Sequence, residues 1–264
     1  MQRSTLFVVG AALAVGIAGY LLLRARQGEA PHAPVERSEP KAPGSPAGGS
    51  ARDGAVARSG MAVIEGEVQF SGAPPSPGKL HREADPYCAR TQILDPTVMA
   101  ANGKLANVWV HVVTGAPDAL PPAAPVELDQ RDCMYTPRVT TAVVGQKVLV
   151  RNGDPVLHNV HAYLGSSSLY NRGMPNEKAA PIEYVAVAPG VMTLKCDVHP
   201  WMRGYVGVSP NAFQAVTGSD GMFRIPNLRP GRYMLAAWHE KFGVKALQVT
   251  APARVIFAYD GSEQ

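Results

Sequence analysis

Three side chains that bind soft metal ions lie within one stretch of seven residues, and this stretch constrains the fold most strongly. Cys196, His199 and Met202 supply a thiolate, an imidazole and a thioether. Their spacing of three residues lets all three converge on one point if the stretch forms a tight turn between two strands. A neighbouring strand must then carry the remaining ligand. His158 is placed to do so, about forty residues upstream and beyond a strand-like run.

One thiolate, two imidazoles and one thioether form the ligand set of a blue-copper centre, a trigonal His₂Cys site with a weak axial methionine. This set suits neither Cu(I) nor Cu(II) fully, and the two oxidation states share one geometry. Similar geometries lower the reorganisation needed for electron transfer. The sequence therefore predicts one mononuclear type 1 copper ion, bound by His158, Cys196, His199 and Met202.

Two neighbours of the ligands are predicted to support them, and other residues of ligand type are not predicted to bind copper. Pro200 stiffens the ligand turn and removes one competing backbone donor. Asn159 ties the two ligand loops together by hydrogen bonds, which fixes the ligand orientation. His161 would point to the strand face opposite His158. The remaining residues predicted to be packing or surface residues are Met174, Met192, His81 and His111.

The rest of the chain favours an all-β protein. With 26 Gly and 24 Pro among 264 residues, many short strands and turns are expected rather than long helices. Strand-like runs cover residues 61–70, 107–113, 126–130, 147–152, 191–195 and 205–208, and others follow between 215 and 259. The net charge of +4 is mild, and no basic run resembles a nucleic-acid footprint.

The two ligand stretches resemble the copper loops of the cupredoxins, most of all those of amicyanin. The similar segments run from His158 to His161 and from Cys196 to Gly204, with weaker likeness back to about residue 125. The resemblance implies a Greek-key sandwich over residues 125–209 with copper on the four ligands named above. It also implies that the ring edge of His199 is the electron port, within a docking patch that includes Trp201. This chain differs from amicyanin-type loops in carrying Trp201 where those loops carry Phe. The positive charge of Arg203 would attract an acidic partner protein.

A second resemblance concerns the segments before and after this region. The run from Thr217 to Tyr233 is similar to the carboxypeptidase regulatory-like, prealbumin-type β-sandwich, whose opening strands resemble residues 64–68 and 108–110. We therefore expect a nested architecture. Residues 61–124 and 210–260 would form this sandwich, with the cupredoxin region inserted. The alternative is three consecutive small units, but the first segment has too few strands to close a core alone.

The N-terminal segment predicts membrane attachment. Residues 5–23 form an apolar run long enough to cross a bilayer as a helix. Tyr20 to Arg24 follow in place of the small-residue cleavage site of a signal peptide, so an uncleaved anchor over residues 1–26 is expected, with the N-terminus inside and the remainder in the periplasm. A cleaved signal peptide is the alternative. Residues 27–60 are rich in Pro, Ala, Gly and Ser without apolar periodicity, which predicts a disordered linker.

The chain has three cysteines, so at least one lacks an intramolecular disulfide partner. If Cys196 binds metal, Cys88 and Cys133 are left as a disulfide pair, which suits an exported protein. Two buried free thiols are the alternative.

These features predict a membrane-anchored blue-copper protein that passes single electrons between a donor and an acceptor protein and is not an enzyme. No Ser/His/Asp order or H-E-x-x-H pattern supports a hydrolase, and further His pairs for a trinuclear copper cluster are absent from the sequence. Two alternatives stay open. The chain is a copper chaperone or carrier, or it is a structural β-sandwich protein with a vestigial copper site.

Overall fold

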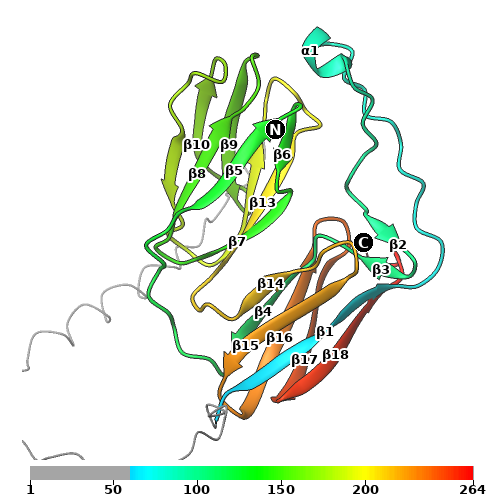
Figure 1. Cartoon of the computed structure of the whole chain (residues 1–264), viewed down its shortest axis with the longest axis vertical. Helices are drawn as coiled ribbons and strands as arrows, with labels where there is room; N and C mark the ends of the chain where they lie inside the picture. Colours follow the sequence, from blue (N-terminus) through cyan, green and yellow to red (C-terminus); the bar gives the residue numbers. More distant parts are fainter. Residues whose placement is uncertain (1–59, 264) are drawn as a thin grey trace, which may run out of the picture. The chain divides into compact units, whose positions relative to one another are not determined.

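A computed structural model describes residues 60–263 (Figure 1). The predicted anchor and nearly all of the predicted linker lie outside these residues. Within residues 60–263, no helix is both long and apolar enough to span a bilayer. The described part is nearly all β, as predicted, and its one α-helix is the short α1 (Pro86–Ala89).

Strands from both ends of the described chain form two sheets, which we call the split sandwich. The first sheet contains β1 (Ala62–Phe70), β2 (Ala100–Ala101), β3 (Lys104–Leu105), β15 (Met222–Leu228) and β18 (Ala253–Tyr259). The second contains β4 (Trp109–Thr114), β14 (Gln214–Val216), β16 (Gly231–His239) and β17 (Gly243–Ala251). Buried side chains of both sheets share one hydrophobic core.

Strand β1 shows why this part of the chain folds as it does. Its residues alternate strictly between buried and half-buried, so one face enters the core, where Ile64 and Val68 are fully buried. β1 pairs in parallel with β18, which brings the two ends of the described chain together. This close approach requires Gly66, because a Cβ atom there would lie 1.9 Å from the carbonyl oxygen of Val255.

The strands between these segments form the central sandwich. One sheet has the order β10-β9-β12-β13-β7 and the other β11-β8-β5-β6. The bounds are β5 (Val126–Arg131), β6 (Met134–Thr136), β7 (Val139–Val143), β8 (Lys147–Asn152), β9 (His158–Leu164), β10 (Ser167–Met174), β11 (Ile182–Val185), β12 (Gly190–Lys195) and β13 (Arg203–Ser209). A second core of buried side chains fills this sandwich.

The two sandwiches contact one another through aromatic rings and a buried ion pair. Trp109 of β4 packs directly on β13, where a Cβ atom at Gly207 would lie 2.3 Å from its indole. Arg138 forms an ion pair with Glu240, and both side chains are buried. The hydroxyl of Tyr205 also donates to Glu240, at 2.9 Å. This contact holds β7 and β13 of the central sandwich against the end of β16.

The stability of the copper-free protein is expected to fall as the pH drops from about 6.5 to about 4. Burial lowers the pKa of both His111 and His239 from 6.5 to about 4, and Arg138 further lowers that of His239. Between these values the unfolded chain binds more protons than the folded one, so protons favour unfolding. Each histidine contributes at most about 1.4 kcal/mol per pH unit. Urea unfolding across this range measures the slope.

The double variant His111→Phe/His239→Phe is the control for this prediction. Phenylalanine keeps the ring of residue 111 stacked on Trp109 and that of residue 239 on Phe242. It removes the titrating nitrogens, so the stability should depend less steeply on pH. An unchanged slope would show that other groups cause the acid sensitivity.

Candidate metal centre

Two connections at one end of the central sandwich bring the predicted ligands together. β8 ends at Asn152, and a short loop leads to His158 at the start of β9. β12 ends at Lys195, and the ligand loop carries Cys196 to Met202 before β13 begins. β9 and β12 are paired antiparallel neighbours, so the loop and His158 lie side by side. The ligand loop closes on itself, because the amide of Met202 donates to the carbonyl of His199 at 2.9 Å.

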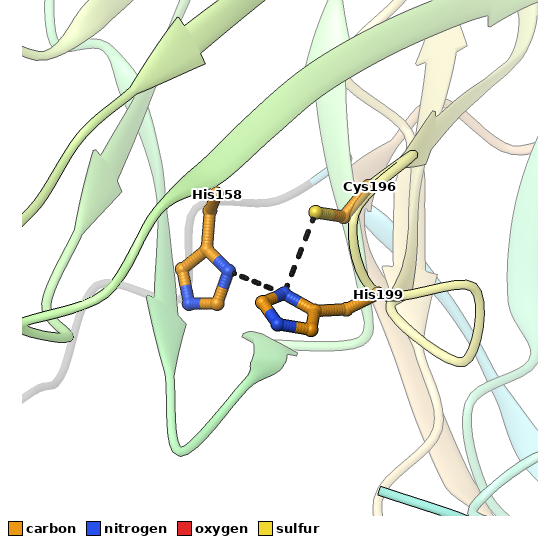
Figure 2. Close-up of side chains that lie close together, drawn as sticks. All are labelled: His158, Cys196 and His199. Carbon is orange, nitrogen blue, oxygen red and sulfur yellow. Dashed lines mark hydrogen bonds between the residues drawn. The ribbon is translucent and has the colours of Figure 1, made fainter. Parts of the chain in front are cut away.

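The side chains of His158, Cys196 and His199 point toward one another (Figure 2). The Nδ1 atoms of the two imidazoles are 2.9 Å apart, and Cys196 Sγ lies 3.8 Å from His199 Nδ1. One ligand atom from each of the three residues lies within 4.8 Å of the others. All three side chains are at most 2 % exposed. The structure therefore places a thiol and two imidazole nitrogens around one buried point.

The outer nitrogen of each imidazole is held by a carboxylate. His158 Nε2 donates to Asp154 Oδ2 at 2.9 Å, and His199 Nε2 donates to Asp85 Oδ2 at 3.1 Å. With its proton on Nε2, each imidazole directs the lone pair of Nδ1 inward. The two Nδ1 atoms then face each other at 2.9 Å, an arrangement that a shared cation between them would stabilise. Carboxylate–histidine pairs of this kind orient ligands around metals, so the donor set fits a copper ion.

The surroundings of Cys196 favour its thiolate. Burial opposes ionisation, but the imidazoles of His158 and His199 and the amide of Asn159 outweigh it and lower the pKa of the thiol from 9.0 to about 6. The Asn159 amide lies 3.5 Å from the sulfur. At neutral pH Cys196 is therefore a ready anionic ligand, which is the form that binds metal.

The carboxylate of Asp154 remains ionised although it is buried. Burial alone would raise its pKa, but hydrogen bonds from His158 and from the amides of Cys133 and Asp132 hold the pKa below its ordinary value. The hydroxyl of Tyr87 adds a fourth donor, at 3.0 Å. Conversely, the hydrogen bond to Asp154 raises the pKa of His158 against the effect of burial.

The other predicted site residues lie around this centre. Met202 is fully buried in the same core cluster as Cys196. Asn159 links the two ligand loops, since its Oδ1 accepts from the amide of Asp197 at 2.6 Å. Pro200 is exposed on the ligand loop between His199 and Trp201.

The prediction that His199 presents its ring edge to a partner is wrong for this structure. The side chain is 1 % exposed, because Asp85 and Cys88 lie against its Nε2 atom. Trp201 is half-buried, with its ring centroid 5.1 Å from that of His199. Arg203 is exposed at the start of β13. Of the three residues predicted for docking, Trp201 and Arg203 reach the surface and His199 does not.

Cys88 and Cys133 are joined by a disulfide, with their Cα atoms 5.7 Å apart, and Cys196 is a free thiol. The disulfide links α1 to the turn between β5 and β6, close to both imidazoles. His161 lies on the outer side of β9, where it hydrogen-bonds Asp197 at 3.0 Å. It is not among the groups of converging ligand atoms in residues 60–263.

Sequence reasoning missed three residues that contact the imidazole side of the centre. Asp154 lies four residues before His158, and a carboxylate at that spacing was a usable signal. Asp85 and Tyr87 offered none, because they lie in an irregular segment more than seventy residues upstream of His158. Only the disulfide and the fold bring this segment to the site.

Solved structures similar to this chain include a purple cupredoxin, amicyanin and a copper-containing nitrite reductase. A purple cupredoxin from Nitrosopumilus maritimus is 26 % identical, covering 32 % of this chain and 99 % of its own, with a TM-score of 0.28. Amicyanin from Paracoccus versutus is 24 % identical, covering 38 % of this chain and 97 % of its own, with a TM-score of 0.29. The Cu-containing nitrite reductase from Thermus scotoductus is 21 % identical, covering 37 % of this chain and 25 % of its own, with a TM-score of 0.30. No protein-family model and no curated protein matches the chain.

Proposed function

We propose that this chain is a blue-copper electron carrier with one mononuclear copper, which His158, Cys196, His199 and Met202 would hold. The observation that carries the proposal is the convergence of one thiol and two inward-facing Nδ1 atoms on one buried point. When bound, copper would supply a one-electron couple between Cu(I) and Cu(II). Asp154 and Asp85 hold the imidazoles in place, and the amide of Asn159 donates to the sulfur.

Burial of the ligands supports electron transfer rather than copper delivery. A copper chaperone must exchange its metal with a partner protein, so its ligands have to be reachable. Here His158, Cys196 and His199 are each at most 2 % exposed. A closed site instead keeps one ligand geometry in both oxidation states, which favours rapid one-electron exchange. The complete ligand set likewise speaks against a vestigial site.

The wider organisation is part of this proposal. Residues 1–26 would anchor the protein in the membrane, and residues 27–60 would be the linker to a periplasmic part. Residues 125–209 would be the cupredoxin domain, inserted in a prealbumin-type sandwich of residues 61–124 and 210–260. The separate sheets and cores of the split and central sandwiches support this division. The chain would act without catalysis, between a redox donor and an acceptor protein.

The direct test is a spectrum of the full-length protein, purified in detergent, with one equivalent of Cu(II). An intense thiolate-to-copper band in the visible range and a narrow copper hyperfine splitting in electron spin resonance are expected. A colourless protein that retains Cu(I) but not Cu(II) would favour copper carriage. A protein that holds neither ion would contradict the proposed function.

A further inference from the structure

The side of His199 that faces away from Cys196 is covered by a segment remote in sequence. We call residues 85–88 the cap; it comprises Asp85 and the first three residues of α1. Asp85 Oδ2 lies 3.1 Å from His199 Nε2, and Cys88 Sγ lies 3.6 Å from the same nitrogen. A carboxylate and a disulfide sulfur thus occupy the position from which solvent would reach the ring edge.

The cap is held by contacts on several sides. The disulfide from Cys88 to Cys133 ties it covalently to the β5–β6 turn. The hydroxyl of Tyr87 donates at 3.0 Å to Asp154, the same carboxylate that holds His158. The free Asp85 oxygen, Oδ1, accepts from the amides of Tyr87 and Cys88 at 2.8 and 3.2 Å. The cap therefore supplies the carboxylate that holds His199 and contacts the carboxylate that holds His158.

A second layer of contacts fastens the chain on either side of the cap. Arg82 is 2 % exposed and donates to the backbone carbonyl of Asp132. Arg90 forms an ion pair of 2.6 Å with the carboxylate of the same Asp132 and lies over the ring of Tyr87. Asp132 and the disulfide partner Cys133 are adjacent, so all these contacts meet at one turn. Cys88 and Cys133 are both fully buried, so a reductant cannot reach the disulfide while the cap is closed.

We propose that the cap closes the copper centre to small external ligands and that Asp85 is a positioning residue for His199. This inference rests on the proposed function. Asp85 keeps the proton of His199 on Nε2 and so keeps Nδ1 directed at the metal position. An anion approaching along the His199 edge meets the Asp85 carboxylate and the apolar disulfide. The copper could therefore exchange electrons with a partner protein, but anions such as nitrite or azide could not bind to it directly.

Because the cap covers His199, electrons would leave the centre through the neighbouring ring of Trp201. The indole lies against the His199 ring, with centroids 5.1 Å apart, and is itself half-buried. Its Nε1 donates at 3.0 Å to the carbonyl of Cys133, which anchors the ring beside the cap. A partner protein would therefore meet the edge of Trp201, next to α1, rather than a bare imidazole.

The test compares copper-loaded full-length variants. Asp85→Ala should weaken copper affinity about 10- to 100-fold, the usual effect of losing a group that orients a ligand. It should also alter the electron-spin-resonance hyperfine splitting. Asp85→Asn retains an oxygen that accepts from Nε2 and should restore both values toward those of the wild type. Glu83→Ala is the matched control, because it removes an exposed carboxylate from the same segment without touching the site.

Addition of azide tests separately whether the cap closes the copper centre to small ligands. The visible spectrum of the wild type should be unchanged by azide, whereas Cys88→Ser/Cys133→Ser should show a new azide-dependent band. Equal azide responses in the two proteins would overturn closure, and an Asp85→Ala protein with wild-type affinity and hyperfine splitting would overturn positioning. Both results leave a blue wild type and so leave the proposed function standing. A wild type without a blue spectrum would overturn the proposed function and this inference together.

Discussion

Replacing Cys196 by serine is expected to abolish the intense visible band of the copper-loaded protein completely. The band requires a thiolate bound to copper, and Cys196 is the free cysteine. Its thiol ionises readily, since the polar groups around the sulfur outweigh its burial and lower its pKa to about 6. A serine hydroxyl at the same place stays protonated at neutral pH and has no comparable charge-transfer transition. Absorption and electron-spin-resonance spectra after one equivalent of Cu(II) measure the change.

His161→Ala is the matched control for this variant. His161 lies on the same strand as His158, β9, but it is on the outer side of that strand and contacts Asp197 rather than the inward-facing ligand atoms. Its removal should leave the visible band unchanged. A blue Cys196→Ser protein would contradict the ligand assignment, and a bleached His161→Ala protein would contradict the choice of histidine.

Arg138→Ala is expected to lower the free energy of unfolding by about 3–5 kcal/mol, because it leaves a buried carboxylate without its cation. The side chains of Arg138 and Glu240 are only 8 % and 4 % exposed. After the substitution, the hydroxyl of Tyr205 would remain as a donor to Glu240. Urea unfolding can be followed by the fluorescence of Trp109 and Trp238, which lie in the same contact between the sandwiches.

Two further variants distinguish the effect of leaving a buried charge unpaired from the effect of losing a side chain. Arg138→Met/Glu240→Leu removes both charges and should recover most of the lost stability, since a buried ion pair is often replaceable by apolar residues. Lys147→Ala breaks an exposed pair with Glu183, whose side chains are 56 % and 49 % exposed, and should cost less than about 1 kcal/mol. Similar losses for Arg138→Ala and Lys147→Ala would contradict the importance of burial.

The residues of the metal centre were largely predictable because their chemistry and spacing are local. Cys196, His199 and Met202 lie on one loop, and the strands on either side of it follow from alternating apolar residues. His158 is farther away in sequence but begins the strand that pairs with β12. Local spacing and strand pairing are both readable from residue types, so the sequence alone was sufficient to select these positions and the all-β class.

The residues that surround the metal centre are brought there by contacts between distant segments of the chain. Asp85 reaches His199 across 114 residues, and Arg138 reaches Glu240 across 102. No local periodicity encodes such pairs, because they arise only after the sandwiches and the disulfide have formed. The error about the electron port has the same origin. The ligand loop by itself predicts an exposed His199, and only the tertiary structure places the cap over it. The sequence thus determined which atoms can bind a metal, and the tertiary structure decided which of them can be reached.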